Sequence, residues 1–437
     1  MLKKLIGVVL LSLLPLTSLW AAEIVGSLGA EVDRLAKKVE PKMIEWRRDI
    51  HQNPELSNRE FRTSKVVAEH LQYLELEVKT GVAHTGVVAL LKGDKPGPVV
   101  ALRADMDALP VIEAVDLPFK SQVKGEYEGK QVGVMHACGH DTHVAILMGV
   151  AEVLTQLKDR LPGTVKFIFQ PAEEGVPQGE EGGAVLMIKE GALENPKPDA
   201  IFGLHVTSIH FTGQLAYRPG PFMASADILR IKVKGRQTHG SAPWSGVDPI
   251  VVASQIVLGL QTIVSRQIDI TQEPAVVTIG SIHGGNRFNI IPDEVDMVGT
   301  IRALDEAMRE DIHKRVKQTA EMIATSAGAI AEVEIEKPYD VSVNHEQLTE
   351  KILPTLRRVA GDQNVIHRSK LTGAEDFSFY QQKIPGFYYF VGVTPAGTDL
   401  TKVAYNHSPK FFVDESALRL GVRSLANLAV DFLQMGR

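Results

Sequence analysis

The chain has 437 residues, of which 44% are hydrophobic and 23% are charged, enough apolar material for large buried cores. This composition excludes a disordered or collagen-like chain. A disulfide-rich chain is also excluded, because the single cysteine, Cys138, cannot form an intrachain disulfide. The net charge is −6 and no basic stripe of the kind expected of a nucleic-acid binder is visible, so we expect no nucleic-acid partner.

Residues 1–22 have the layout of a secretory signal peptide. Two lysines precede an apolar run over residues 5–14, and Ala21 and Ala22 offer a cleavage point. The run is short for a membrane span, which needs roughly twenty residues, and we expect no other segment to be long and apolar enough to cross a bilayer. The mature protein is therefore expected to be exported, periplasmic or secreted, and not held in a membrane. A single unpaired cysteine is typical of a chain in the reducing cytoplasm. In a chain expected to be exported, this thiol therefore needs a specific explanation.

Strands alternate with helices from about residue 31 to residue 204. This order predicts an α/β fold with a mostly parallel central sheet and helices on both faces. Continuous apolar runs rich in β-branched residues mark the buried strands. After two amphipathic helical stretches, the predicted strands cover residues 85–91, 97–102, 164–169 and 200–204, and the predicted helices cover 143–158 and 184–189.

The pattern changes over residues 223–338. Leu229, Ile231 and Val233 alternate with charged residues, as in a half-exposed strand, and Asp248 followed by Pro249 is a good start for a helix. The order β-α-β-β-α-β is that of a ferredoxin-like unit. Its predicted elements are strands near 229–233, 275–282, 294–301 and 331–335, with helices over 248–264 and 305–327.

We therefore predict an inserted α+β domain over 223–338, between two parts of a larger domain, 23–222 and 339–437. The second part is expected to hold a helix over 345–359, a strand over 387–393 and a closing helix after Asp414.

The densest group of metal-capable side chains lies between Met135 and His143. Cys138 and His140 offer a thiolate and an imidazole on either side of Gly139, a combination that suits zinc and similar divalent ions. A buried cysteine or a lone histidine is usually structural, but several such side chains so close together favour a metal site.

Further candidates follow the predicted strands, where the ligands of open α/β sheets gather. In the adjacent pair Glu173 and Glu174, one carboxylate could bind metal while the other takes a proton from a bound water. A solvated acidic turn is the structural alternative for this pair. The other candidates at strand ends or in turns are Asp105, Asp107, His205 and His407.

Six separated segments, RADMDALP, HACGHDTH, PAEEG, GLHV, GAEDF and NHSPKF, occur in this order along the chain. Together they resemble the M20 family of metallopeptidases and amidohydrolases. The subfamily they resemble most contains N-acyl-amino-acid amidohydrolases, hippurate hydrolases and auxin-conjugate hydrolases. The resemblance runs from His51 to the closing helix.

The resemblance implies two divalent metal ions, zinc, manganese, cobalt or nickel, with Cys138 as the bridging ligand. It also implies Glu173 as the general acid/base, with Asp105 and Asp107 supporting the site and Asp107 counted among the catalytic residues. Most other M20 branches carry His and Asp at positions 105 and 138, and the segment 176–183 looks longer than usual. The implied metal ligands are Cys138, His140, Glu174, His205 and His407.

For the inserted domain, the resemblance implies a lid through which two chains form a homodimer. His239 would then complete the active site of the partner subunit, and Asn289 and Arg302 would bind substrate. The strand pattern places Arg302 on the polar face of its strand.

The expected function is metal-dependent hydrolysis of the amide bond of N-acyl amino acids with acetyl, benzoyl or aryl-acetyl groups. Three alternatives remain open. One is a dipeptidase or carboxypeptidase of the same fold, and another is a thiol amidase in which Cys138 is the nucleophile. The third is an exported protein that binds a small molecule without cleaving it.

Overall fold

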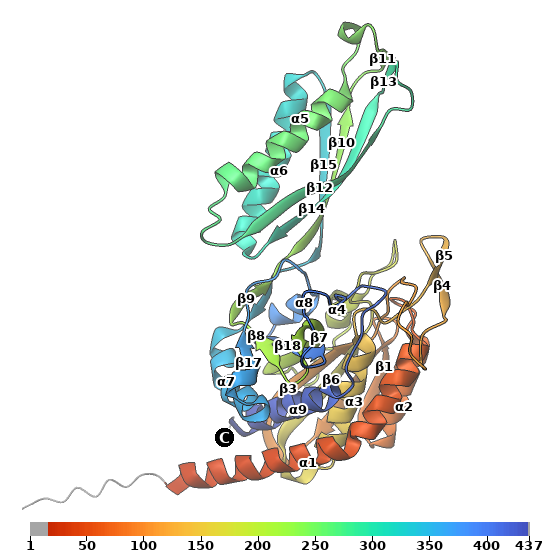
Figure 1. The fold of residues 1–437 in the computed structure, drawn as a ribbon. Coiled ribbons are helices and arrows are strands. Elements are labelled where there is room, and N and C mark those ends of the chain that lie inside the picture. Colours follow the sequence, from red (N-terminus) through yellow and green to blue (C-terminus); the bar gives the residue numbers. More distant parts are fainter. Residues whose placement is uncertain (1–15, 436–437) are drawn as a thin grey trace, which may run out of the picture.

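The computed structural model describes residues 16–435 (Figure 1). Residues 1–15 of the predicted signal peptide lie outside the described residues, and the first described element is helix α1 (Leu16–Gln52).

The larger part of the molecule is built on an eight-stranded sheet. Strands β6, β3, β7 and β18 are parallel neighbours at its centre, whereas β1 and β2 are antiparallel additions at one edge. This mostly parallel sheet confirms the predicted fold class. The strands, in their order across the sheet, are β1 (Glu77–Val82), β2 (Gly86–Lys92), β6 (Pro162–Gln170), β3 (Lys95–Asp105), β7 (Ala200–Phe211), β18 (Gly386–Thr394), β8 (Leu215–Tyr217) and β17 (Val365–His367).

Helices cover both faces of this sheet because alternate strand residues point to opposite sides. Val100 and Leu102 belong to one apolar core, whereas Ala101 between them belongs to the other. The first core packs against α1, α2 (Phe61–Tyr73), α3 (His140–Thr155), α7 (Glu346–Ala360) and α9 (Ala417–Met435). The second packs against α4 (Gly183–Lys189) and α8 (Phe377–Gln381).

A separate four-stranded antiparallel sheet lies between Ala226 and Tyr339, and we call this unit the lid. Its order, β12-β14-β10-β15, is that of the predicted ferredoxin-like arrangement. Asp248 accepts hydrogen bonds from the first backbone N–H groups of α5, which fixes the start of that helix. The elements are β10 (Ala226–Lys234), α5 (Pro249–Thr262), β12 (Ala275–Gly284), β14 (Glu294–Ala303), α6 (Glu306–Ser326) and β15 (Ile330–Tyr339).

Several predicted boundaries differ from the structure, and two of these differences lie at the candidate site. Strand β7 continues past the predicted end at residue 204 to Phe211, because β18 pairs with it as far as that residue. Helix α3 begins at His140 rather than at residue 143. The short strands that the sequence did not indicate are β1, β8 and β17 of the large sheet, together with β4 (Lys124–Tyr127), β5 (Lys130–Gly133), β9 (Gly220–Met223), β11 (Thr238–His239), β13 (Ile290–Ile291) and β16 (Ser342–Asn344).

The expectation that no segment beyond residue 22 could span a membrane is wrong. By length and composition the helix over Pro249–Gln267 meets that requirement, with a mean hydropathy of 1.3. Apolar residues lie on both of its faces: Val252 and Ile256 pack into the lid core, whereas Leu258 is 71% exposed.

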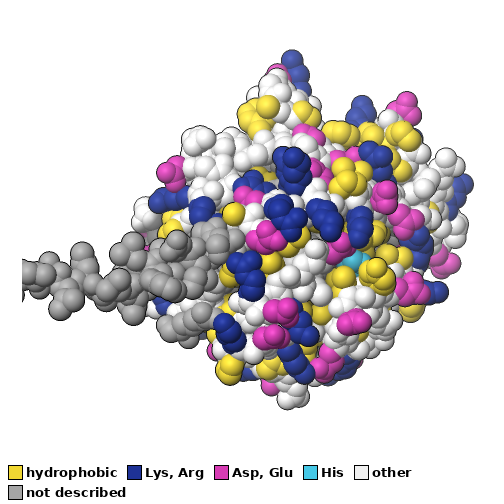
Figure 2. All heavy atoms as spheres, turned by 90° about the horizontal axis from the view of Figure 1, so that it is seen from below, with side chains coloured by type: hydrophobic (Ala, Val, Ile, Leu, Met, Phe, Trp, Pro, Cys, Tyr) yellow, Lys and Arg dark blue, Asp and Glu magenta, His cyan; other side chains and the backbone are white. Residues whose placement is uncertain are grey.

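Basic and acidic side chains are interspersed over the face of the molecule seen in Figure 2. Ion pairs such as Lys42 with Glu152, at 2.7 Å, and Arg423 with Asp33, at 2.8 Å, join surface helices. Exposed pairs of this kind contribute little stability, at most about 1 kcal/mol each.

Candidate metal centre and active site

The structure brings five predicted ligands together at the carboxyl edge of the central sheet. One triplet of donor atoms comes from Cys138, His140 and His205, and a second comes from Cys138, Glu174 and His407. Within each triplet the donor atoms lie within 4.8 Å of one another, and Cys138 belongs to both. A thiol shared by two donor sets has the geometry of a ligand that bridges two ions.

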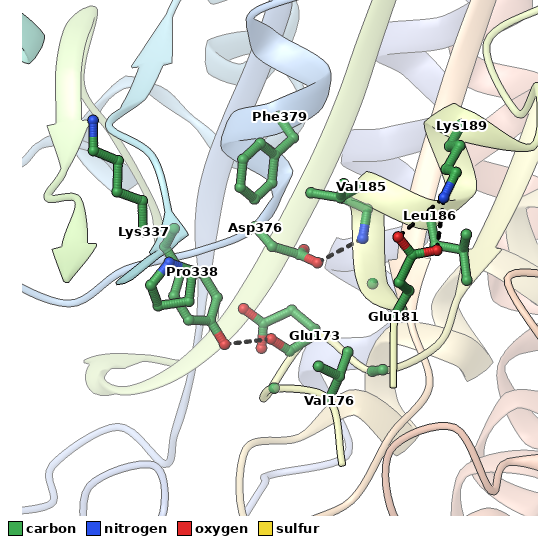
Figure 3. A pocket seen from close by; sticks show the side chains of 16 residues that line it. Glu173, Val176, Glu181, Val185, Leu186, Lys189, Lys337, Pro338, Asp376 and Phe379 are labelled. Carbon is green, nitrogen blue, oxygen red and sulfur yellow. Dashed lines mark hydrogen bonds and ion pairs between the residues drawn. The ribbon is translucent and has the colours of Figure 1, made fainter. Parts of the chain in front are cut away.

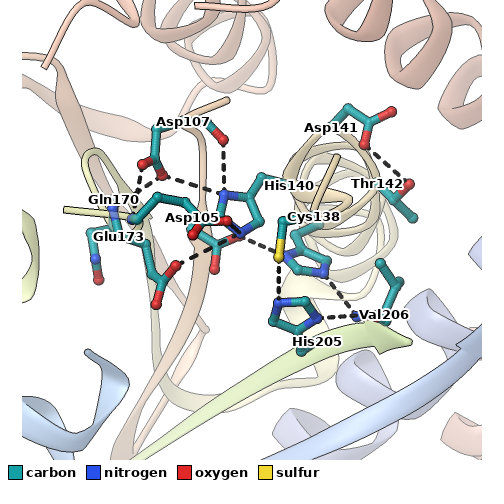
Figure 4. Close-up of polar contacts among 12 residues, drawn as sticks. Asp105, Asp107, Cys138, His140, Asp141, Thr142, Gln170, Glu173, His205 and Val206 are labelled. Atoms are coloured by element: carbon teal, nitrogen blue, oxygen red, sulfur yellow. Dashed lines mark hydrogen bonds and ion pairs between the residues drawn. The ribbon is translucent and has the colours of Figure 1, made fainter. Parts of the chain in front are cut away.

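The five candidate ligands come from four separate stretches of the chain. Cys138 precedes α3 and His140 begins it, while Gly139 between them has a φ of 95°, where a Cβ would collide with Val206. The sharp turn at Gly139 therefore needs a residue without a side chain. His205 lies on β7, where its ring faces Cys138 (Figure 4).

The remaining two ligands lie on loops. Glu174 follows β6, and His407 follows β18 on a loop whose backbone N–H donates to Ala137 O at 2.8 Å. Asn406 Nδ2 donates to Cys138 O at 3.0 Å and so ties this loop to the cysteine. His407 is exposed, whereas His140 and His205 are buried, so the site opens on the His407 side.

Hydrogen bonds hold two of the imidazoles with Nε2 toward the centre of the site. His140 Nδ1 donates to Asp107 O at 2.8 Å, and His205 Nδ1 donates to Val206 O at 2.6 Å. His205 Nε2 and His407 Nε2 lie 3.3 Å and 3.2 Å from Cys138 Sγ. A backbone partner on the second nitrogen is the usual support of a metal-binding histidine, because it fixes the tautomer and the ring orientation.

The electrostatics of the site fit a bound cation. Among the described residues, His140 Nε2 is buried and has no hydrogen-bond partner, while Glu174 Oε1 lies 3.2 Å from His407 Nε2. Burial, together with Glu174 and Glu173, raises the pKa of the Cys138 thiol well above its usual value. Burial alone would lower the pKa of His140, but Asp105 and Asp107 raise it to about 10. Bound divalent cations would favour the deprotonated forms of Cys138 and His140 and would coordinate His140 Nε2. The residues present therefore fit a metal centre.

Asp107 shapes the turn that carries the two glutamates. Its Oδ1 and Oδ2 accept hydrogen bonds from the backbone N–H groups of Glu173 and Glu174, both at 3.0 Å. Ser57 Oγ donates to the same carboxylate at 2.8 Å. Asp107 is therefore placed behind the glutamates, where it fixes their backbone.

A buried charge network around Arg103, which the sequence analysis did not single out, lies next to Glu173. Arg103 Nη1 donates to Asp105 Oδ2 at 2.5 Å, and Arg103 Nη2 lies 3.0 Å from Glu375 and 2.8 Å from Asp376. Oxygens of Glu173, Glu375 and Asp376 lie within 4.8 Å of one another. Burial, then Glu375 and Glu174, raise the pKa of Glu173 well above its usual value. The GAEDF motif was the only sequence signal for this pair of acids.

His143 and Tyr339 also contact the candidate site, although the sequence analysis does not place them in it. His143 Nδ1 donates to Asp105 Oδ1 at 2.5 Å, and its Nε2 accepts from Val206 N at 2.9 Å. Both ring nitrogens are used, so His143 orients its neighbours and is not free to bind metal. Tyr339 Oη donates to Glu173 O at 2.7 Å, which joins the end of the lid sheet to the site.

The three predicted lid residues are not in one place. Arg302 is half-buried near the end of β14 that leads toward the larger sheet. His239, on β11, is exposed at the opposite end of the lid, where Gly240 N bonds to Asn289 O (Figure 1). With a rise of about 3.3 Å per strand residue, the two ends of β14 (Glu294–Ala303) lie roughly 30 Å apart. Within one chain, His239 and Asn289 are therefore not brought to the five ligands.

Comparison with known protein families gives one match that covers most of the chain. The family described as Peptidase family M20/M25/M40 matches residues 101–431.

Individual proteins are also similar over nearly the whole length. The chain is 44% identical over 398 residues to Thermostable carboxypeptidase 2 of Saccharolobus solfataricus, covering 91% of this chain and 96% of that protein. It is 39% identical over 399 residues to N-acetylcysteine deacetylase of Bacillus subtilis, covering 91% and 98%. Among solved structures, the YXEP protein of Bacillus subtilis, a dinuclear metal binding peptidase from the M20 family, superposes with a TM-score of 0.75. It is 36% identical, with 91% of this chain and 99% of that chain covered.

Replacing the shared thiol tests the metal centre. Cys138→Ser is expected to lose bound metal and activity together, because a hydroxyl is a far weaker ligand than a thiolate for both donor sets. Metal content per chain by mass spectrometry and hydrolysis rate are the two measurements. Glu350→Gln, at an exposed position of α7 in the larger domain, is the control and should change neither. Unchanged metal content and activity in Cys138→Ser would refute this centre.

Proposed function

Because the chain belongs to Peptidase family M20/M25/M40, whose members are metal-dependent hydrolases acting on amides, we propose that it hydrolyses N-acyl amino acids. The products are a carboxylate and a free amino acid. The observation that carries this proposal is the thiol of Cys138 between two donor triplets, with Glu173 next to them. The similarity to a protein named N-acetylcysteine deacetylase supports the same substrate class.

In the proposed reaction, the bound ions and the side chains of the protein have different roles. Two divalent ions, which Cys138, His140, Glu174, His205 and His407 would hold, would supply the Lewis acidity that lowers the pKa of a water molecule and polarises the amide carbonyl. Glu173 takes the proton of that water as it attacks, and then returns the proton to the departing amine nitrogen. Glu173 Oε2 lies 3.9 Å from His140 Nε2, which places the base beside the ligands.

Other residues bind and orient the substrate in this proposal. Arg302, at the near end of the lid, pairs with the free carboxylate of the amino acid, a planar partner that a guanidinium suits. The partner subunit's His239 stabilises the negative oxygen that forms on the attacked carbonyl, and Asn289 lies next to it. This assignment needs a homodimer, since His239 lies at the end of the lid remote from its own ligand set.

The lid surface supports dimer formation. Ile250, Val251 and Leu258 on α5 are 43%, 53% and 71% exposed, and β12 is an edge strand of the lid sheet. An apolar helix face beside an open strand edge is a surface that another chain can cover.

A second candidate is a carboxypeptidase, which the 44% identity to Thermostable carboxypeptidase 2 favours. The two substrate classes differ on the acyl side of the scissile bond. A peptide with a free N-terminus carries a charged amine there, whereas an N-acyl amino acid carries an uncharged acyl group.

The proposed base can be tested without disturbing the ligands. Glu173→Gln is expected to lower kcat by about 10²–10⁴-fold, because the amide cannot accept the proton of the attacking water. Metal content should stay at the wild-type value. Glu334→Gln, at an exposed lid position, is the matched control and should keep full activity. Near wild-type turnover in Glu173→Gln would show that another group is the base.

The proposed exchange of His239 between subunits predicts complementation. Glu173→Gln and His239→Ala should each be inactive alone, but mixed dimers contain one site with both wild-type groups. After subunit exchange, an equal mixture should recover about a quarter of the wild-type activity, because half of the dimers are mixed. No recovery in a mixture shown to exchange subunits would contradict a shared site.

A further inference from the structure

A pocket of about 450 Å³ adjoins Glu173, and the chemistry described above does not use it (Figure 3). It lies between α4, the segment 176–183 and the last residues of β15. This segment is the one that looks longer than usual in the sequence. The side chains that form the apolar walls are Val176, Val185, Leu186 and Phe379.

The walls of this pocket expose apolar side chains. Val185 is 52% exposed and Val176 is 42% exposed, although both line a concave surface. Small-molecule sites commonly have such a lining, with a few polar groups placed among apolar ones. The free energy gained by covering these side chains favours an apolar ligand.

The charged groups of the pocket already have partners. Lys189 Nζ bonds to both carboxylate oxygens of Glu181, at 3.0 and 2.7 Å, and Lys337 pairs with Glu310. Asp376, at the floor, accepts hydrogen bonds from Arg103, Gln170 and the backbone of Ala184. Because the cations are paired and the floor is acidic, the α-carboxylate of an amino acid is disfavoured in this pocket.

The position of the pocket connects it to the reacting amide. Glu173 lines the pocket, and its Oε2 lies 3.9 Å from His140 Nε2, so the pocket adjoins the place where the attacked carbonyl would lie. A second pocket, of about 390 Å³, lies on the Glu174 side of the same turn and includes Glu126 and Glu128. Val176 lines both pockets and therefore divides them.

The dividing segment is held firmly in place. Arg59 Nη2 pairs with Glu180 Oε1 at 2.6 Å, and Asn58 Nδ2 donates to Glu181 O at 3.0 Å. On the far wall, Ala184 N donates to Asp376 Oδ2 at 2.8 Å and fixes the start of α4. The pocket is thus a preformed cavity, which reduces the entropy lost when a ligand binds.

We propose that this pocket is the acyl subsite and that it takes an apolar acyl group, aryl or of medium chain length. The proposal rests on the function proposed above and adds the acyl preference to it. Val185, at the start of α4, is the residue whose size and polarity set that preference.

The test is a substrate matrix with two variants of Val185. Hydrolysis of acetyl, hexanoyl and benzoyl leucine is compared with hydrolysis of benzoyl glycine and benzoyl phenylalanine. Val185→Asp should lower kcat/KM for the hexanoyl and benzoyl compounds at least about tenfold and leave acetyl leucine near wild type. Val185→Trp, which fills the pocket without adding charge, should reject the same bulky acyl groups.

Val343→Asp is the matched control, since Val343 is 41% exposed on β16 and does not line the pocket; it should change no substrate. An equal effect of the Val185 variants on all three acyl groups would overturn the subsite, as would no effect. A shift that follows the amino acid instead would also overturn it, because the pocket would then hold that side chain. If the wild-type protein hydrolyses no compound in the matrix, the proposed function falls, and the subsite with it.

Discussion

The candidate site depends on the position of one sulfur atom. Cys138 Sγ lies 3.3 Å from His205 Nε2 on β7 and 3.2 Å from His407 Nε2 on the loop after β18. The same residue precedes the helix that His140 begins, so a strand, a loop and a helix start converge on it. Such convergence is available only where the carboxyl ends of parallel strands meet. It also accounts for a lone thiol in a chain expected to be exported, since a second cysteine could trap it as a disulfide.

Holding this arrangement requires buried charges on both sides of the ligands. On one side Arg103 balances Asp105, Glu375 and Asp376. On the other side, Arg47 on α1 pairs with Asp141 at 3.0 Å, directly after the ligand His140. Leaving any one of these charges unpaired in the interior would cost several kcal/mol, roughly 3–5 by analogy with other buried pairs. The networks therefore fix the backbone around the site and resist its rearrangement.

The sequence predicted the parts of the site that depend on local pattern. Glu173 and Glu174 follow a continuous apolar strand, and His205 follows another, so their shared edge could be inferred from strand ends. The identity of the fold followed from the same alternation of strands and helices. Their roles within the site came from the resemblance, which the family match confirms at the level of the family.

Other features depend on tertiary packing and could not be predicted in this way. That His143 uses both ring nitrogens while its neighbour His140 keeps one open is decided by Asp105 and the backbone of Val206. The distance of His239 from the candidate ligands follows from the direction of the lid strands. The pocket beside Glu173 follows from the placement of α4 and the end of β15 around it. None of these leaves a periodic signal in the sequence.

If Cys138 is a metal ligand and not a nucleophile, hydrolysis must depend on bound metal. Titration of metal-free protein with zinc or manganese, with hydrolysis of acetyl leucine measured at each step, tests it most directly. With Cys138 as a ligand, we expect no activity without metal and a rise that saturates at about two ions per chain. Full activity in the metal-free protein, abolished when iodoacetamide alkylates Cys138, would contradict it.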